Sequence, residues 1–227
     1  MSASPPAFSD VVSALEVMHC SEFWHWTAES NPFEVVVGAI LVQHTNWTNA
    51  ERALARLRLA GILEPKLLAG LTDKEIEELI RSSGEYHTKA KKLRAFLCLI
   101  ARYGSLEALL EEPVHKLRDQ LLDTWGIGEE TADAIVLYAA RQPAVVVDGY
   151  TRRLFGRLGL GPSPSDSYRE WQAYLKAELP ESVQELAAFH AFVVLHAKKL
   201  CLARHPRCSD CNLASRCAFA NDPPLPP

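Results

Sequence analysis

The sequence predicts an all-α fold, and three observations support this prediction. Apolar residues recur at three- and four-residue spacing along nearly every segment. The alternation of apolar and polar residues that is typical of β-strands is absent. Helix-start signals occur where Asn31 can cap a helix beginning with Pro32, and where Thr72 and Glu75 form a capping box. The 227 residues, 48% of them hydrophobic, can form one large domain or two small ones.

In chain order, the periodicity predicts helices joined by short turns. Residues 33–42 are apolar on all sides, which predicts a central buried helix. Gly126-Ile127-Gly128 separates two helices as a hairpin, Pro143 ends the second helix, and Asp148 opens a third. The other predicted helices span residues 7–27, 48–59, 72–82, 89–102, 105–110, 113–125, 167–178 and 182–199, and a proline-rich tail without structure covers 221–227.

The bulk composition argues against several classes of protein. No apolar run is long enough to cross a bilayer and the N-terminus lacks a secretion signal, so we expect a cytoplasmic protein that contacts no membrane. The net charge of −4 argues against a globally basic nucleic-acid binder, so such binding would need local patches. One basic patch covers residues 198–217, where Asp210 is outnumbered by Lys198, Lys199, Arg204, Arg207 and Arg216.

Two polar clusters each allow a structural and a functional interpretation. The cluster Gln43-His44-Thr45-Asn46-Trp47 follows the central helix. It is either a helix end before a new helix capped at Thr48, or a loop that inserts side chains into a partner. The second cluster opens the predicted helix 89–102 and is either a solvated charged face or a set of phosphate contacts: Lys89, Lys91, Lys92 and Arg94.

The glycine hairpin and Asp148 are ambiguous when taken alone. Glycines accept positive φ and let a backbone approach a ligand closely, and the N–H groups of the helix that follows can hold a phosphate. A glycine turn between two helices is also common in helical proteins. Asp148 is the one carboxylate between an apolar run and a basic helix that contains Arg152, Arg153 and Arg157.

The six cysteines divide into two groups. Cys20 and Cys98 are isolated in apolar helical segments, where we expect inert core thiols. The other four, Cys201, Cys208, Cys211 and Cys217, have the spacing C-x6-C-x2-C-x5-C. Disulfides are not expected without a secretion signal, and structural zinc usually takes paired CxxC motifs or histidines. Four thiolates within one compact loop suit a [4Fe–4S] cluster, which would order a segment rich in arginine.

Aromatic residues are dense near the N-terminus. Phe23, Trp24 and Trp26 lie together, and Trp47 follows the central helix. Their spacing favours a packed core slightly over a pocket that stacks a planar ligand.

The cysteine spacing, GIGEETADAI and VVDGYTRR together resemble the helix-hairpin-helix DNA glycosylases of the endonuclease III superfamily. The resemblance covers roughly residues 30–217. Three stretches, PFEVVVGAILVQHTNWTNAE, SGEYHTKAKKL and GIGEETADAIVLYA, are most similar to 3-methyladenine DNA glycosylase III. The resemblance implies a monomeric enzyme that binds double-stranded DNA, flips a damaged base out of the stack and cuts its glycosidic bond.

The resemblance also implies a division into lobes and roles for individual residues. A six-helix lobe would cover residues 31–143, and a cluster lobe would combine 1–30 with 144–220, with DNA bound across the cleft between them. Gly126 and Gly128 would anchor a phosphate, Gln43 would fill the space left by the flipped base, and Asp148 would be the catalytic carboxylate. Lys198, Arg152, Arg204 and Arg207 would contact DNA, with Lys198 alternatively near the base, and Cys201, Cys208, Cys211 and Cys217 would hold the cluster.

Glu130 departs from the pattern of bifunctional endonuclease III, which has a lysine two residues after the second hairpin glycine. A carboxylate cannot form the imine that leads to strand cleavage. We therefore expect a monofunctional glycosylase acting on an alkylated purine such as 3-methyladenine, whose positive charge would favour a pocket formed by Trp24, Trp26 and Trp47. The alternatives are a bifunctional enzyme acting on oxidised pyrimidines through another amine, and a damage-binding module with little catalysis.

Overall fold

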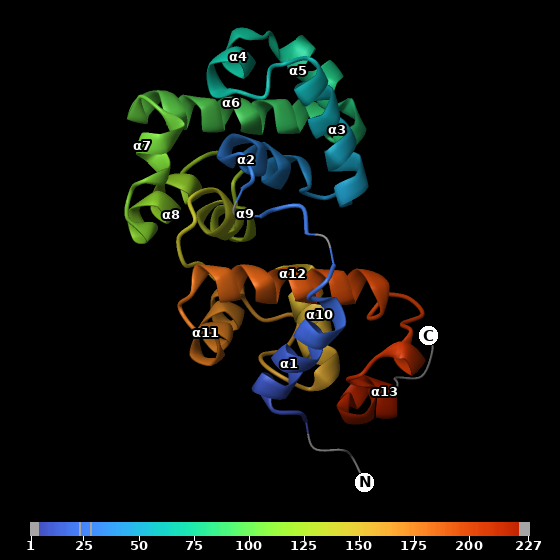
Figure 1. The fold of residues 1–227 in the computed structure, drawn as a ribbon. Coiled ribbons are helices and arrows are strands. Elements are labelled where there is room, and N and C mark those ends of the chain that lie inside the picture. The colour runs from blue at the N-terminus through green and yellow to red at the C-terminus, as the bar shows by residue number, and fades with distance from the viewer. Residues whose placement is uncertain (1–4, 23, 28, 223–227) are drawn as a thin grey trace. The chain divides into compact units, whose positions relative to one another are not determined.

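The computed structural model describes residues 5–22, 24–27 and 29–222, and every regular element among them is a helix (Figure 1), which confirms the all-α prediction. The α-helices are α1 (Phe8–His19), α2 (Pro32–Leu41), α3 (Trp47–Leu59), α4 (Pro65–Gly70), α5 (Asp73–Ile80), α6 (Tyr86–Tyr103), α7 (Leu106–Leu110), α8 (Val114–Leu122), α9 (Glu129–Ala134), α10 (Gly149–Leu158), α11 (Tyr168–Glu178), α12 (Val183–Lys199) and α13 (Ala218–Asn221). Short 3-10 turns are η1 (Arg81–Ser83), η3 (Cys208–Asp210) and η4 (Ala214–Arg216), and η2 (Ile135–Ala139) is a π-helix.

Contacts between residues divide the chain into two compact units. Unit 1 comprises Met1–Trp24 and Val145–Pro227, and unit 2 comprises His25–Ala144. Each unit buries its own apolar core. None of the helices in the described part of the chain is long and apolar enough to cross a membrane.

Unit 2 is built around α2. From Phe33 to Leu41 this helix is buried at every position except Glu34, as its uniformly apolar sequence predicts. It packs against α3, α6 and the π-helix η2. The helix face at Gly38 is closely packed, since a Cβ there would make van der Waals contact with the side chains of Leu54 and Trp47 at 3.4 Å and with Trp26 at 3.5 Å.

Helix starts in unit 2 follow local capping chemistry. The Asn31 side chain accepts hydrogen bonds from the Phe33 and Glu34 N–H groups, with Pro32 at the first helical position. Thr72 and Glu75 form the predicted capping box. The next helix, α3, is capped by Asn46 rather than by Thr48, because the Asn46 Oδ1 atom already accepts the Asn49 N–H at 3.0 Å and starts the helix earlier.

Unit 1 centres on α12, against which α1 and α10 pack. Three phenylalanines join these helices: Phe8 stacks on Phe155 at a centroid distance of 5.3 Å and on Phe189 at 5.9 Å. Trp171 of α11 is completely buried, and its indole N–H donates to the Ser163 carbonyl at 2.8 Å. The loop before α11, predicted as a linker, is therefore fastened to the helix that follows it.

Several predicted helix boundaries differ from those of the structure. The first helix ends at His19 instead of continuing to residue 27, and α4 falls in a segment for which no helix was predicted. The helix after the hairpin widens into η2, where the Ala140 N–H bonds to the Ile135 carbonyl. Asn221, assigned to the unstructured tail, is the last residue of α13, and residues 223–227 lie outside the described part of the chain, as does Phe23.

Candidate functional site

Asp148 caps the N-terminus of α10, as the sequence predicts. It follows a short buried apolar run and is itself only 7% exposed. Its Oδ1 atom accepts two hydrogen bonds from Thr151, one from the backbone N–H at 2.7 Å and one from the hydroxyl at 2.8 Å. An aspartate at an N-cap satisfies otherwise unpaired N–H groups and is favoured by the helix dipole.

The second carboxylate oxygen of Asp148 faces His190 of α12. The His190 Nε2 atom lies 3.6 Å from Oδ2, and the imidazole is 6% exposed. Burial alone raises the pKa of Asp148, but His190 and the two bonds from Thr151 outweigh burial and lower it below the ordinary value of 3.8. The structure therefore holds a buried carboxylate in its ionised form. His190 has no sequence signal, because a single histidine on an apolar helix is more often a packed core residue.

Lys198 lies two turns after His190 on α12. Its ammonium group sits over the Tyr150 ring at 5.8 Å from the centroid. Although the residue as a whole is exposed, partial burial lowers the pKa of this amine, and the negative charge of Asp148 opposes that shift. An amine with a lowered pKa has a larger neutral, nucleophilic fraction near neutral pH.

In unit 2, the glycine hairpin is held by side chains of α6 and of the segment after α2. Gly126 has a φ of +84°, and a Cβ there would lie 2.4 Å from the Lys92 side chain, so only glycine fits. The Gln43 amide donates to the Gly126 carbonyl at 3.2 Å and to the Thr131 hydroxyl at 2.9 Å, and its oxygen accepts from the Lys92 ammonium. These contacts form one network, which we call the Gln43 network.

The second hairpin glycine has a different environment. Gly128 has no neighbouring atom within 4 Å of where a Cβ would be, so the space beside its backbone is open. It precedes the first turn of α9, where Glu129 and Glu130 are exposed. Carboxylates are favourable there because of the helix dipole, so Glu130 has a local structural reason to be acidic.

The basic residues at the start of α6 do not form a uniform surface. Lys89 is 1% exposed, and its ammonium donates to the carbonyls of Leu41 at 2.9 Å and Ser83 at 2.6 Å. Burial lowers the pKa of Lys89 to about 8. Both interpretations proposed for Lys89, a solvated face and a phosphate contact, are therefore wrong. Arg94 bonds to Asp73 and to two carbonyls, whereas Lys91 is exposed.

The aromatic residues named for a base pocket fall into two groups. Trp26 is 8% exposed and packs with Trp47 at a centroid distance of 5.5 Å and with Tyr138 at 5.1 Å, within unit 2. His25 stacks on Trp47 at 3.6 Å. Trp24 belongs to unit 1 and meets His190 edge to face at 5.9 Å. Trp26 thus matches the core interpretation, and Trp24 is the tryptophan beside the carboxylate-bearing turn.

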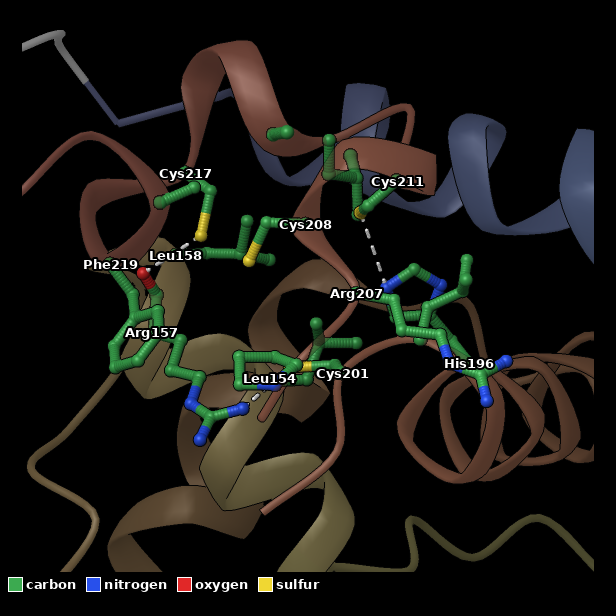
Figure 2. A pocket seen from close by; sticks show the side chains of 15 residues that line it. Leu154, Arg157, Leu158, His196, Cys201, Arg207, Cys208, Cys211, Cys217 and Phe219 are labelled. Carbon is green, nitrogen blue, oxygen red and sulfur yellow. Dashed lines mark hydrogen bonds between the residues drawn. The ribbon is translucent and has the colours of Figure 1, made fainter. Parts of the chain in front are cut away.

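The four clustered cysteines line a single pocket between α10, the end of α12 and the loop that follows (Figure 2). All four are free thiols. Arg157 donates to the Cys201 sulfur at 3.3 Å and to the carbonyls of Leu202 and Ala203, and the Cys217 thiol lies 3.3 Å from the Arg157 carbonyl. Cys20 and Cys98 are both exposed, so the expectation of core thiols is wrong for them.

The thiols of this pocket are arranged to suit one kind of metal group better than another. Among the described residues, no three His, Cys, Asp or Glu side chains are close enough to hold a single metal ion. Four thiols spread around one pocket fit a cubane cluster better, because each cysteine binds a separate iron atom. Burial and the neighbouring thiols raise the pKa values of Cys211 and Cys217, so binding a metal would release their protons.

Other arginines of this region either bond to groups within the protein or are exposed at its surface. Arg153 donates to the carbonyls of Cys201 and Ala197, and Arg152 donates to those of Pro164 and Asp166. Arg216 pairs with Asp10 at 2.5 Å. Arg204 and Arg207 are exposed. Among these arginines, Arg204 and Arg207 are therefore available to a binding partner.

Comparison with known proteins places this geometry in a family. Residues 37–181 match the profile of the HhH-GPD superfamily base excision DNA repair proteins. A Methanocaldococcus jannaschii protein provisionally named a DNA repair glycosylase is 37% identical over 195 residues, covering 85% of this chain and 87% of that protein. Endonuclease III of Thermotoga maritima is 28% identical over 197 residues, covering 84% of each.

Solved structures agree with the sequence relatives. The H. pylori 3-methyladenine DNA glycosylase bound to 1,N6-ethenoadenine superposes with a TM-score of 0.73 at 29% identity, covering 84% of this chain and 96% of that one. An endonuclease III trapped as a covalent intermediate with DNA has a TM-score of 0.80 at 24% identity, covering 94% and 95%, and shows the same fold. The chain belongs to the HhH-GPD superfamily of base excision DNA repair proteins and is a DNA glycosylase.

Proposed function

We propose that this glycosylase is monofunctional and hydrolyses the bond between deoxyribose and an alkylated purine. The observation that carries the proposal is Asp148, a buried carboxylate held ionised at the N-terminus of α10. Glu130 supports the monofunctional part, because a carboxylate at that position cannot form an imine. The similarity to a glycosylase solved with 1,N6-ethenoadenine, a modified adenine, supports the substrate class.

The hydrogen bonds of Asp148 indicate which oxygen would act. Oδ1 accepts both bonds from Thr151, whereas Oδ2 faces only His190 among the contacts described for Asp148. As the glycosidic bond breaks, the departing base takes the bonding electrons and the sugar gains positive charge. Oδ2 would stabilise that charge and accept the proton of the water that attacks C1′. The products are the free base and an abasic sugar.

The hairpin and the basic residues would position DNA without reading its sequence. The open space beside Gly128 allows a phosphate to approach the backbone, and Lys198, Arg204 and Arg207 carry positive charge at the surface of unit 1. Gln43 is proposed to fill the space of the flipped base. It would have to exchange its bonds to Gly126 and Thr131 for bonds to DNA. Arg152 would likewise have to release two carbonyls.

Two further assignments belong to the same proposal. Trp24, beside His190, is the tryptophan that we assign to stacking on the damaged base, whereas Trp26 and Trp47 pack against each other within unit 2. Cys201, Cys208, Cys211 and Cys217 would hold a [4Fe–4S] cluster, which would supply a rigid staple for the loop that carries Arg204 and Arg207.

The test is a panel of duplexes, each with one defined lesion, incubated with the enzyme and analysed with and without alkali. Release of alkylated purines, with strand breaks only after alkali, is the expected result. Release confined to oxidised pyrimidines would contradict the substrate class. Binding to lesions without any base release would favour a damage-binding module instead.

One observation favours a second candidate, a bifunctional enzyme. Lys198 is an amine of lowered pKa within the electrostatic influence of Asp148, a neighbour that the sequence alone did not indicate. Borohydride would trap an imine between Lys198 and the C1′ atom of the sugar as a covalent adduct. An adduct formed by the wild type and absent in Lys198→Met would establish this activity, and an adduct in neither protein would reject it.

A further inference from the structure

His190 and Asp148 form a buried pair in unit 1. The two residues come from different helices, α12 and the start of α10, and they are 6% and 7% exposed. The edge of Trp24 meets the imidazole at 89° between the ring planes. A buried histidine beside a buried carboxylate costs free energy unless the two groups satisfy each other.

Donor and acceptor chemistry determines which nitrogen carries the proton. An ionised carboxylate can only accept hydrogen bonds, and Oδ1 already accepts two from Thr151. The atom facing Oδ2 can bond to it only as a donor, so we assign a proton to His190 Nε2. The separation of 3.6 Å is slightly longer than a hydrogen bond, and a small approach of the two groups would form one.

We propose that His190 is a positioning residue for the glycosylase reaction: its Nε2–H group orients Oδ2 of Asp148 and keeps the carboxylate ionised. This inference rests on the proposed function, because it assigns His190 a role through Asp148. Thr151 holds one oxygen through two hydrogen bonds and His190 faces the other, so together they favour one orientation of the carboxylate. Such restraint keeps the reacting oxygen in place before the sugar charge develops.

A merely structural role would give different results. If His190 only fills space, any substitution of similar volume would change stability and activity together. If it orients Asp148, a side chain that keeps a donor near Nε2 would preserve the rate, whereas an apolar one would not. Glutamine places its amide nitrogen near the position of Nε2, and leucine places no polar group there.

The experiment compares His190→Leu and His190→Gln with the wild type on the lesion that the wild type processes best. His115→Gln, on an exposed position of α8, is the matched control. Single-turnover base release, affinity for uncleaved DNA and thermal stability are measured for each. We expect His190→Leu to lower the single-turnover rate roughly tenfold or more, with DNA affinity little changed, and His190→Gln to recover most of the rate.

Two outcomes overturn the inference while leaving the proposed function intact: a His190→Leu rate equal to that of the wild type, or equal losses in both variants that follow their stability. Wild-type enzyme that releases no base from any lesion overturns the proposed function and this role together. NMR of the wild-type protein gives a readout independent of activity. It should show His190 protonated at Nε2, and an Nε2 without a proton would also overturn the assignment.

Discussion

Helix α10 connects two regions of unit 1 that are built on different physical principles. At its N-terminus, the Asp148 turn is completed by protein groups, since Thr151 and His190 engage both carboxylate oxygens. Toward its C-terminus, the cysteine pocket gathers four free thiols, two of them with raised pKa values, and is linked to the helix through Arg153 and Arg157. The first region is organised by the fold alone, whereas the second supplies ligands for a group that would complete it.

The comparison predicts that the two regions respond separately to substitution. The largest effect on the cysteine pocket should come from Cys211→Ser, which would remove one ligand of the proposed cluster. We expect loss of bound iron and sulfide, and faster amide hydrogen exchange in the loop after α12. The Thr151 amide should keep its protection because its acceptor is Asp148.

Cys98→Ser is the matched control, since that thiol is exposed on α6 and should change neither iron content nor exchange. Equal loss of protection at Thr151 and in the loop would show that the two regions are not independent.

Arg157→Lys should give a smaller effect on the same region. The substitution keeps the charge but removes the fork of donors that reaches the Leu202 and Ala203 carbonyls. We expect iron to be lost to a chelator several times faster, on the order of threefold to tenfold, with base release per loaded enzyme unchanged. Arg169→Lys, at an exposed position of α11, controls for the chemistry of the exchange. An unchanged rate of iron loss to the chelator would show that Arg157 does not stabilise the cysteine pocket.

Thr151→Val tests the Asp148 turn with a modest change. It deletes the hydroxyl bond to Oδ1 at 2.8 Å and retains the bond from the backbone N–H. We expect single-turnover base release to fall roughly threefold to tenfold, because the carboxylate loses one of its restraints. Ser83→Ala, which deletes another buried hydroxyl bond, should leave the rate unchanged. A rate unaffected by Thr151→Val would mean that the hydroxyl does not restrain Asp148.

The smallest expected effect is on the pH dependence of folding stability, and it is specific to the ionisation of Asp148. Because the folded pKa of Asp148 is below 3.8, the ionised carboxylate stabilises the fold above that value, and this contribution is lost as the pH falls through the lower folded pKa. The stability difference between the wild type and Asp148→Asn should therefore shrink as the pH falls below 3.8. A difference that stays constant through acid unfolding would contradict a lowered pKa.

Local patterns in the sequence were sufficient to predict most helices, the Asp148 cap and the set of four cysteines. Each of these depends on residues a few positions apart, such as Asp148 with Thr151. The predicted N-cap of α3 was wrong, because Asn46 and Thr48 are both good capping residues and Asn46 caps the helix.

Other features depend on contacts between distant segments, which no short pattern encodes. Lys89 is buried because two carbonyls, from the end of α2 and from η1, converge on its ammonium group. His190 reaches Asp148 only because α12 packs against α10. The widening of the helix at η2 likewise has no signal in residue propensities.

The central claim is that Asp148 is the catalytic carboxylate, and Asp148→Asn tests it most directly. Asparagine is an equally good N-cap, so the fold of α10 should be retained. We expect single-turnover release of an alkylated purine to fall by at least roughly a hundredfold, while affinity for the same duplex remains within about threefold of the wild type. Base release by Asp148→Asn at the wild-type rate would contradict it.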